Sequence, residues 1–304
     1  MNTENLERFF YWINERHAIY RKKVIGDPPP FTKDKILQEY KFTNPFREND
    51  KVTIWMRQNW TNPNHNKPDG EIIFNCCLFR MVGTTEFAEA HGWASKWEPE
   101  YTKQLIAERL AKKLRTFTGA YIITNQGLKL PKGEVVVDHF LTPIWESKEK
   151  LAEIATNTQS LQALHHAMSA YRGWGGGGFM SYEVVTDLNY TRILDEATDR
   201  FTWANAGPGA KRGLNRLYDR PLTKGLTAVQ SNIEMKKVLD IAQGTRNVVS
   251  IENVDMRTIE HSLCEWDKYE RVRLGQGTPR SKYDAHLSSL LNYNKWKTLE
   301  GPVA

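Results

Sequence analysis

The sequence predicts a mainly α-helical protein with at most one small β-hairpin. Apolar residues recur at three- and four-residue spacing over most of the chain, which is the period of an amphipathic helix. β-branched runs typical of strands occur only at residues 120–124 and 135–137, so they are too few for a sizeable sheet. With 304 residues, the chain is long enough to bury a large core.

Six segments of the first half have the helical period: residues 5–23, 33–40, 48–60, 71–81, 84–91 and 101–113. The first ends before Gly26 and a run of prolines. Thr32 is expected to cap the second, because its hydroxyl can accept a hydrogen bond from the first turn. Residues 61–70, rich in Asn and Pro, are expected to form a loop, and helices should dominate again after residue 148.

The two β-branched runs are expected to pair as a hairpin closed by the Asn-Gln-Gly turn at residues 125–127. This stretch predicts a boundary between an N-terminal helical part, residues 1–130, and a second part, residues 131–304, that carries the active site. One continuous domain is the alternative.

Composition favours a polyanionic partner and a reducing compartment. The formal net charge is +6 and the pI is about 9.0. Three cysteines, two of them adjacent, suit neither a disulfide framework nor a zinc cluster. Since no signal-peptide pattern and no run of about 18 apolar residues occurs, a cytoplasmic protein without a membrane partner is expected.

A run of four glycines, residues 175–178, precedes a helical pattern. Amides in such a turn are open to an anion, and the dipole of the following helix favours negative charge. Gly177 and Gly178 are therefore expected to bind a DNA phosphate, with a tight turn between packed helices as the alternative. No Gly-Lys-Ser/Thr follows, so the run is not a nucleotide-binding P-loop.

A second glycine turn, Gly207-Pro208-Gly209, enters a helix that begins with two cations. Amides and cations at one point suit a phosphate, and the pattern resembles the hairpin of helix-hairpin-helix DNA-binding proteins. The residues expected to contact DNA here are Gly207, Gly209, Lys211, Arg212, Asn215 and Arg216. A turn that serves packing alone is the alternative.

Asp199 is a candidate catalytic carboxylate. In helix-hairpin-helix DNA glycosylases an aspartate follows the hairpin after one helix, and Asp199 has this place relative to Gly178. The glycosylases that form a covalent imine carry a lysine early in the hairpin helix. Met180 and Ser181 stand there instead, so lyase chemistry is not expected. Capping of the helix that follows is the alternative role for Asp199.

Residues 264–283 combine carboxylates with cations. If this stretch begins as a helix, Asp267 and Arg271 are four residues apart and share a face. The functional interpretation is a general base flanked by cations that receive a pyrophosphate. The catalytic candidates are Glu265, Asp267 and Lys268, and the candidate pyrophosphate ligands are Arg271, Arg280 and Lys282. A solvated salt-bridge face is the alternative.

A polar turn between two predicted helices supplies a candidate base pocket, lined by Tyr40, Phe42, Asn44 and Arg47. The side-chain amide of Asn44 could read a base edge. By periodicity alone, Phe42 and Phe46 are expected in the core. The histidines show no metal-ligand spacing, so no metal site is expected among them.

Six segments along nearly the whole chain resemble the bacteriophage helical family of α-glutamyl/putrescinyl-thymine pyrophosphorylases, also found as the helical domain of 5-hydroxymethyluracil DNA kinases. The segments are FFYWINER at 9–16, ILQEYKFTN at 36–44, FTGAY at 117–121, GFMSYEVVTDL at 178–188, GPGAKRGLNR at 207–216 and CEWDKY at 264–269. The resemblance implies a fold similar to helical DNA glycosylases and a role in rebuilding thymine in phage DNA, in the host cytoplasm.

In such pathways hydroxymethyluracil in DNA is phosphorylated and pyrophosphorylated, and an amine then displaces the pyrophosphate. Because the chain lacks a P-loop, the resemblance implies the displacement step. The implied partners are double-stranded DNA with modified thymine, an amine donor such as glutamate, glycine, serine or putrescine, and a separate DNA kinase. The base would leave the duplex and lie between aromatic side chains. No cofactor is identified, and a role for Mg²⁺ stays open.

Two other functions fit the same features. A DNA glycosylase acting on a modified base needs the same pocket and a single aspartate. A non-catalytic DNA-binding module would present the substrate to a separate kinase, and it would bind DNA with strong salt dependence.

Overall fold

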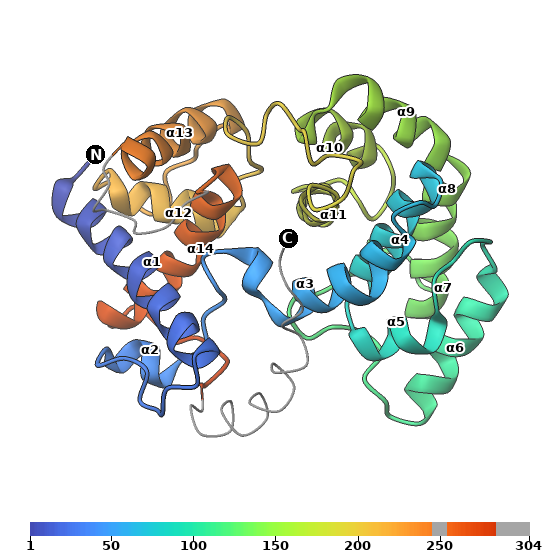
Figure 1. The fold of residues 1–304 in the computed structure, drawn as a ribbon, viewed down its shortest axis with the longest axis horizontal. Coiled ribbons are helices and arrows are strands. Elements are labelled where there is room, and N and C mark those ends of the chain that lie inside the picture. The colour runs from blue at the N-terminus through green and yellow to red at the C-terminus, as the bar shows by residue number, and fades with distance from the viewer. Residues whose placement is uncertain (245–253, 284–304) are drawn as a thin grey trace. The chain divides into compact units, whose positions relative to one another are not determined.

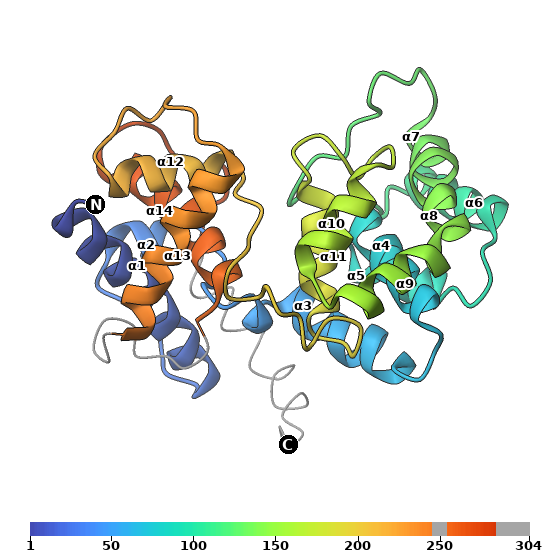
Figure 2. The ribbon, with the colours of Figure 1, turned by 90° about the horizontal axis from the view of Figure 1, so that it is seen from above.

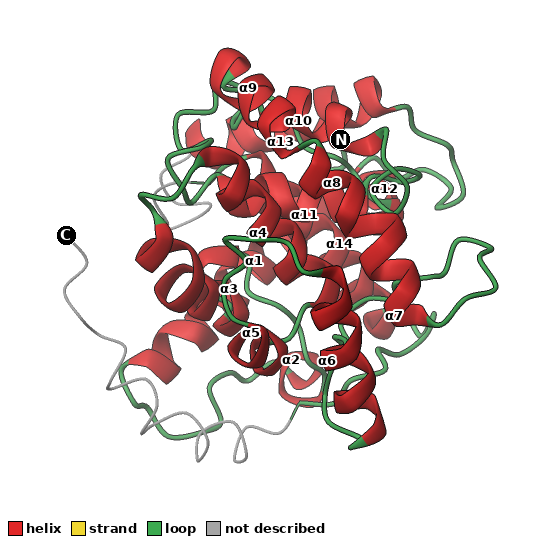
Figure 3. Cartoon of the chain, turned by 90° about the vertical axis from the view of Figure 1, so that its right-hand side faces the viewer, coloured by secondary structure: helices red, strands yellow, loops and turns green. Residues whose placement is uncertain are grey.

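Helices form nearly all the regular structure in the computed structural model, which describes residues 1–244 and 254–283. Within these ranges Figure 3 shows helices and connecting loops without a strand, so the predicted mainly α-helical fold is confirmed. The chain divides into two compact units. The terminal unit joins Met1–Asp50 to the residues from Ala206 onward, and the central unit is Lys51–Asn205. The boundary expected after residue 130 falls inside the central unit.

The terminal unit combines helices from both ends of the chain (Figure 1). Its elements are α1 (Thr3–Val24), α2 (Lys35–Glu39), the short 3-10 helix η1 (Arg47–Asn49), α12 (Pro208–Leu217), α13 (Ala228–Gly244) and α14 (Met256–Arg273). α12 and α14 pack against each other, and both α1 and α13 pack against this pair, as Figure 2 shows from above. Segments far apart in the sequence therefore share one core.

Two glycines set the close approach of α12 and α14. A Cβ atom at Gly209 would lie 2.3 Å from Cys264 Sγ, and one at Gly213 would lie 2.5 Å from the carbonyl oxygen of Leu263. These glycines are four residues apart and share a helix face. A larger side chain at either position would force the two helices apart, so both glycines serve packing.

Aromatic side chains of α1 fill the core beside this helix pair. Phe9 and Trp12 are fully buried, and Phe9 meets Trp266 of α14 edge-on with ring centroids 5.5 Å apart. Each such side chain contributes roughly 1.5–3 kcal/mol through burial. The buried stripe Phe9, Phe10, Trp12, Ile13 and Ile19 is the apolar face predicted for this helix.

The central unit surrounds one fully buried helix. Its elements are α3 (Lys51–Met56), η2 (Arg57–Thr61), η3 (Asn62–Asn64), α4 (Asp69–Val82), α5 (Thr85–His91), α6 (Pro99–Ala111), α7 (Lys132–Glu134), η4 (Val135–Leu141), α8 (Thr142–Glu146), α9 (Lys148–Thr158), α10 (Leu161–Ser169) and α11 (Phe179–Leu188). α4 is buried from its second residue to its last and packs against α9 and α11. A helix that is apolar on all sides is typically buried on all sides, and the sequence of α4 has this character.

The predicted hairpin is wrong. Residues 135–137 belong to η4, a π-helix, where all three valines are buried, and residues 120–124 lie in a loop. η4 packs against α4, α6 and α8, so tertiary burial overrides the strand preference of β-branched residues. The helix expected over residues 48–60 is also divided, into η1, α3 and the π-helix η2.

The predicted cap of the second helix is wrong by two residues. Asp34 Oδ1 accepts hydrogen bonds from the amides of Ile36 and Leu37 at 2.9 and 3.1 Å, so Asp34 caps α2. Thr32 Oγ1 instead accepts from the amide of Asp34 at 3.0 Å and donates to Glu15. In the two described ranges, no helix has both the length and the apolar character needed to cross a membrane.

Candidate functional site

Three arginines converge on one buried carboxylate between α12 and α14. Asp267 is 0% exposed, and its two oxygens accept hydrogen bonds from Arg212 Nε at 2.8 Å and Arg216 Nε at 2.9 Å. Arg271 Nε lies 3.6 Å from Asp267 Oδ2, in the i,i+4 pair that the sequence spacing predicts. Three guanidinium groups face one carboxylate, so this arginine cluster has an excess of positive charge.

Two of the three arginines are partly open to solvent. The side chains of Arg212 and Arg271 are 39% and 38% exposed, whereas Arg216 is 7% exposed and donates from Nη2 to Gln276 at 2.8 Å. Arg212 and Arg271 face Asp267 through Nε, and no hydrogen bond within the described ranges uses their Nη atoms. A guanidinium held in this way can present its Nη groups to a phosphate.

A second polar group, the threonine cluster, consists of Thr43, His261, Glu265 and Lys268. Glu265 accepts from the amide of Thr43 at 2.9 Å and from Lys268 Nζ at 2.7 Å, and His261 Nε2 is hydrogen-bonded to Thr43 Oγ1. Burial alone would raise the pKa of Glu265. The nearby Lys268 ammonium and His261 lower this pKa by more, so it lies below its ordinary value. This carboxylate therefore remains ionised at neutral pH.

The residues predicted to form the base pocket are mostly buried. Tyr40, Phe42 and Asn44 are 7%, 5% and 7% exposed, and Arg47 pairs with Asp50. The Phe42 ring lies against Trp12 at 6.1 Å between centroids, and Lys268 Nζ lies 4.8 Å from its centre. The core position expected for Phe42 and Phe46 by periodicity is confirmed. Contact with a base stays a prediction.

Sequence reasoning missed three residues that the structure brings to this region. Arg16 donates from Nε and Nη2 to the carbonyl oxygen of Phe42 at 3.2 and 3.1 Å, which holds the turn before Thr43. Arg16 and Thr43 both lie in segments that carry the family resemblance, so a signal existed for them. His261 has no distinctive sequence spacing, and only its hydrogen bond to Thr43 identifies it.

Several residues predicted to contact DNA have structural partners. The amide of Gly207 donates to Glu260 Oε1 at 3.2 Å, and Gly209 packs against Cys264. Asn215 is 0% exposed and donates to the carbonyl oxygens of Leu222 and Lys224, so it ties α12 to the following loop. Arg212 and its half-buried neighbour Lys211 remain the best placed of this set for a phosphate.

The last two predicted pyrophosphate ligands lie beyond α14. Lys282 forms an ion pair with Glu39 and lies 4.4 Å from the ring centre of Tyr40, within a two-residue antiparallel bridge. Its charge is therefore already compensated. Arg280 is exposed on the preceding turn. For both, pyrophosphate binding stays a prediction.

The four-glycine turn joins α10 to α11 in the central unit. Gly178 has φ +67° and is the N-cap residue of α11, and a Cβ there would lie 2.4 Å from His165 Nε2. The carbonyl oxygen of Gly177 accepts a hydrogen bond from Asn205 Nδ2 at 2.8 Å. The carbonyl oxygen of Gly178 is hydrogen-bonded to His165 Nε2 at 3.1 Å. A Cβ at Gly177 would meet nothing within 4 Å, so this side of the turn is open. Phosphate binding here stays a prediction.

Asp199 caps a helix. Its carboxylate accepts from Ser160 Oγ at 2.7 Å and from the amides of Leu161 and Gln162 at 2.8 and 2.9 Å, at the start of α10. The capped helix thus precedes Asp199 in the chain instead of following it. Three hydrogen bonds satisfy both oxygens, which favours the structural role over the catalytic one.

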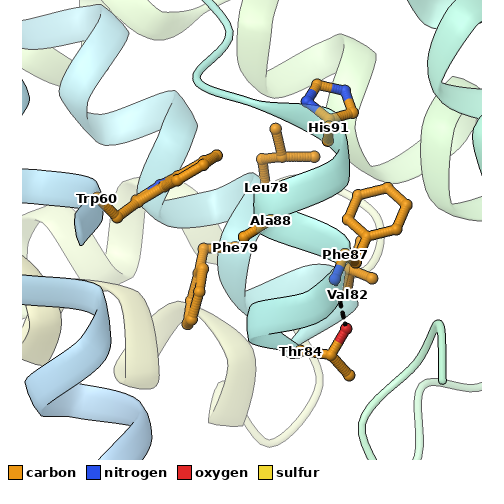
Figure 4. Close-up of a pocket in the computed structure, with 8 residues that line it drawn as sticks. All are labelled: Trp60, Leu78, Phe79, Val82, Thr84, Phe87, Ala88 and His91. Atoms are coloured by element: carbon orange, nitrogen blue, oxygen red, sulfur yellow. Dashed lines mark hydrogen bonds between the residues drawn. The ribbon is translucent and has the colours of Figure 1, made fainter.

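The aromatic side chains of the central unit line a shallow apolar hollow, shown in Figure 4. Its lining residues are Trp60, Leu78, Phe79, Val82, Thr84, Phe87, Ala88 and His91. The hollow has no room for a water-sized sphere, and Thr84 Oγ1 is occupied by the amide of Phe87 at 3.2 Å. It is therefore a packing feature. In the described parts of the chain, no three His, Cys, Asp or Glu side chains group as metal ligands would.

Comparison with known proteins places the chain in a family named for a DNA kinase. The family described as 5-hmdU DNA kinase, helical domain, matches residues 3–278. The chain is similar to the 5-hmdU DNA kinase of Bacillus phage SP10, with 24% identity over 291 residues. That match covers 85% of this chain and 44% of the relative, so the chain spans less than half of the relative's length. No solved structure matches the chain.

Proposed function

Because the chain belongs to the family of 5-hmdU DNA kinase helical domains, we propose that it acts on hydroxymethylated uracil in DNA, at the step in which an amine displaces pyrophosphate. The kinase activity named for the relative is not assigned to this chain, which corresponds to 44% of that protein and contains no P-loop sequence. Displacement needs no nucleoside triphosphate site. It needs a cationic site for the leaving group.

The arginine cluster is the observation that supports this reaction. Asp267 accepts a hydrogen bond from Arg212 Nε and forms an ion pair at 3.6 Å with Arg271 Nε, and about two-fifths of each arginine side chain stays exposed. Pyrophosphate carries several negative charges, and a pair of prepositioned guanidinium groups can bind it through two hydrogen bonds each. Donors that are oriented before the reaction stabilise developing charge without a cost of reorganisation.

The proposed reaction is a substitution at the exocyclic methylene carbon of the base. The amine nitrogen forms a bond to this carbon while the carbon–oxygen bond to pyrophosphate breaks. The electron pair of the broken bond leaves on pyrophosphate, where Arg212 and Arg271 receive the added negative charge. The nitrogen then loses one proton to a side chain of the protein. The products are the substituted DNA base, pyrophosphate and a protonated side chain.

We propose that His261 accepts this proton from the amine. The carboxylate of Asp267 is fully buried and paired with arginines, and Asp199 is engaged in capping α10, so neither oxygen pair is available to an amine. His261 lies one helical turn before Glu265 on α14 and is hydrogen-bonded to Thr43, and imidazole is suited to accept a proton at neutral pH. Glu265, which stays ionised, would then favour the imidazolium that forms.

A non-catalytic DNA-binding module is the second candidate. The pairing of Asp267 and the capping by Asp199 favour it, because the two aspartates expected to be catalytic have structural partners instead. The module would present hydroxymethyluracil DNA to a separate kinase. It predicts tight, salt-dependent binding and unchanged bases.

Nucleoside mass spectrometry tests these functions directly. Purified protein is incubated with duplex DNA that carries pyrophosphorylated hydroxymethyluracil, a pool of amino acids and polyamines, and either Mg²⁺ or a chelator. A new adduct on the base, lost in Arg212→Gln and Arg271→Gln, is the expected result. Arg273→Gln is the matched control, because Arg273 lies on the same helix but pairs with Glu270 outside the cluster.

Each other outcome selects a different function. An abasic product would identify a glycosylase, and bound but unchanged DNA would identify the recognition module. An adduct whose yield is the same in Arg212→Gln, Arg271→Gln and Arg273→Gln would show transfer while removing the arginine cluster from the mechanism.

A further inference from the structure

The loop between α6 and α7, residues 112–131, is long and purely basic in its charged residues. Lys112, Lys113, Arg115 and Lys129 are all exposed, and these residues include no Asp or Glu. Arg115 lies 3.6 Å from Glu86, which compensates one of the four charges. Loops of this length within a compact unit are commonly functional. We call this segment the basic loop.

The middle of the basic loop is anchored to the core of the central unit. The amide of Thr118 donates to the carbonyl oxygen of Val82 at 2.9 Å, and Tyr121 Oη donates to the carbonyl oxygen of Arg80. On the far side, Arg172 Nη2 donates to the carbonyl oxygen of Gln126 at 2.9 Å. These contacts bind both sides of the loop tip to α4 and to the turn after α10.

An isoleucine projects from this anchored tip. Ile122 is 79% exposed, more than any other large apolar side chain in the described ranges, while Ile123 beside it is 9% exposed. The ring of Tyr121 packs edge-on against Phe179 at 5.4 Å, and Phe179 is itself 49% exposed. Two solvent-exposed apolar side chains therefore flank one tyrosine, next to a loop whose charges are all positive.

We propose that the basic loop contacts duplex DNA, with Ile122 inserted into the base stack and the lysines on the adjacent phosphates. Proteins that unstack a base step commonly insert an apolar side chain there, with cations on the neighbouring backbone. An enzyme that works on a base must first free it from the stack. Because all charged residues of the loop are basic, a polyanionic partner is favoured over a protein surface with few acidic residues. The proposal rests on the proposed function only in that its ligand is DNA.

A fluorescence measurement tests the insertion. A duplex with 2-aminopurine beside hydroxymethyluracil is titrated with the full chain, and binding of the unchanged protein should increase fluorescence as the base unstacks. In Ile122→Ala the increase at saturation should fall about fivefold or more, while the dissociation constant changes less than about threefold. Val229→Ala is the matched control, because Val229 is 71% exposed on α13 in the terminal unit.

Salt dependence tests the lysines. Lys112→Gln combined with Lys113→Gln should weaken binding to any duplex and reduce the slope of log K against log salt by roughly 0.9 for each lost phosphate contact. Lys150→Gln, at an exposed position of α9, should leave the slope unchanged.

Two results would overturn the proposal. One is an equal fluorescence increase for Ile122→Ala and the unchanged protein. The other is loss of self-association in Ile122→Ala with unaltered DNA binding, which would assign the tip to a protein contact. Neither measurement needs an amine or a pyrophosphate, so absence of transfer alongside the expected fluorescence would reject the proposed reaction and leave the DNA contact standing.

Discussion

Arg212 of α12 and Asp267 of α14 share a hydrogen bond of 2.8 Å that joins two helices and turns one guanidinium edge outward. The same carboxylate also accepts from Arg216, so it compensates charge in the core and orients groups at the surface. The packing of α12 against α14 and the proposed binding of an anion therefore depend on the same buried side chain.

Asp267→Asn should lower the free energy of unfolding by about 3–5 kcal/mol, because the buried guanidinium group of Arg216 loses its counter-charge. Urea denaturation followed by circular dichroism measures the change. Asp240→Asn is the control, since Asp240 forms an exposed pair with Lys236 and should change stability by less than about 1 kcal/mol. Equal stability of the two variants would contradict the inferred role of Asp267.

Gly209→Ala should destabilise the terminal unit by about 1–3 kcal/mol, since the new methyl group would meet Cys264 Sγ. Adding Cys264→Ala removes that sulfur and should restore part of the loss, which a double-mutant cycle measures. Gly177→Ala, at an open position of the central unit, should leave stability unchanged. Additive effects of the first two changes would rule out the predicted contact.

Asp199→Ala should lower stability by about 1–2 kcal/mol because the first turn of α10 loses its acceptor. Transfer activity per folded molecule, with the folded fraction measured by near-ultraviolet circular dichroism, should stay within about twofold of the unchanged protein if the role is capping alone. The exposed Asp195→Ala serves as the control. A loss of turnover well beyond the loss of folded protein would restore the catalytic assignment.

His17 should make stability depend on pH. Burial, and then the nearby Arg21 and Arg16, lower its pKa to about 4, and its Nδ1 is buried without a hydrogen-bond partner. The folded state therefore keeps the ring neutral while the unfolded chain protonates it below about pH 6.5, so the free energy of unfolding falls from pH 6.5 toward pH 4.

Because the His17 ring is only half-buried, we expect a loss of about 1 kcal/mol between pH 7 and pH 5, smaller than the full shift implies. Urea midpoints at the two pH values should differ less in His17→Leu than in the unchanged protein. His166→Gln, at an exposed position of α10, should retain the full difference.

The helices could be predicted where one face is buried. The positions of α1 and α4 follow from their apolar spacing, and the helix predicted over residues 84–91 is α5, which begins one residue later because Thr84 is its cap. The strand predicted from the valines at 135–137 is wrong because strand preference is weak compared with burial against α4. Local propensity carries no information about which distant helix will cover a segment.

The candidate site was predictable only in its local part. Asp267 and Arg271 are an i,i+4 pair, so their spacing shows the contact. The hydrogen bonds from Arg212 and Arg216 cross 55 and 51 residues and leave no periodic signal. His261 reaches Thr43 across 218 residues, and a single histidine without ligand spacing gives no reason to expect that contact.

The discontinuous terminal unit has a consequence for biosynthesis. α1 leaves the ribosome before the central unit, but α12 and α14, against which it packs, follow that entire unit. At about 5–20 residues per second, α1 must wait roughly ten seconds or longer with its aromatic face uncovered. The central unit is continuous in the chain and can fold during this interval. Arg212, Arg271 and Asp267 meet only after α14 has left the ribosome, so a nascent chain that stops before α14 never assembles the arginine cluster.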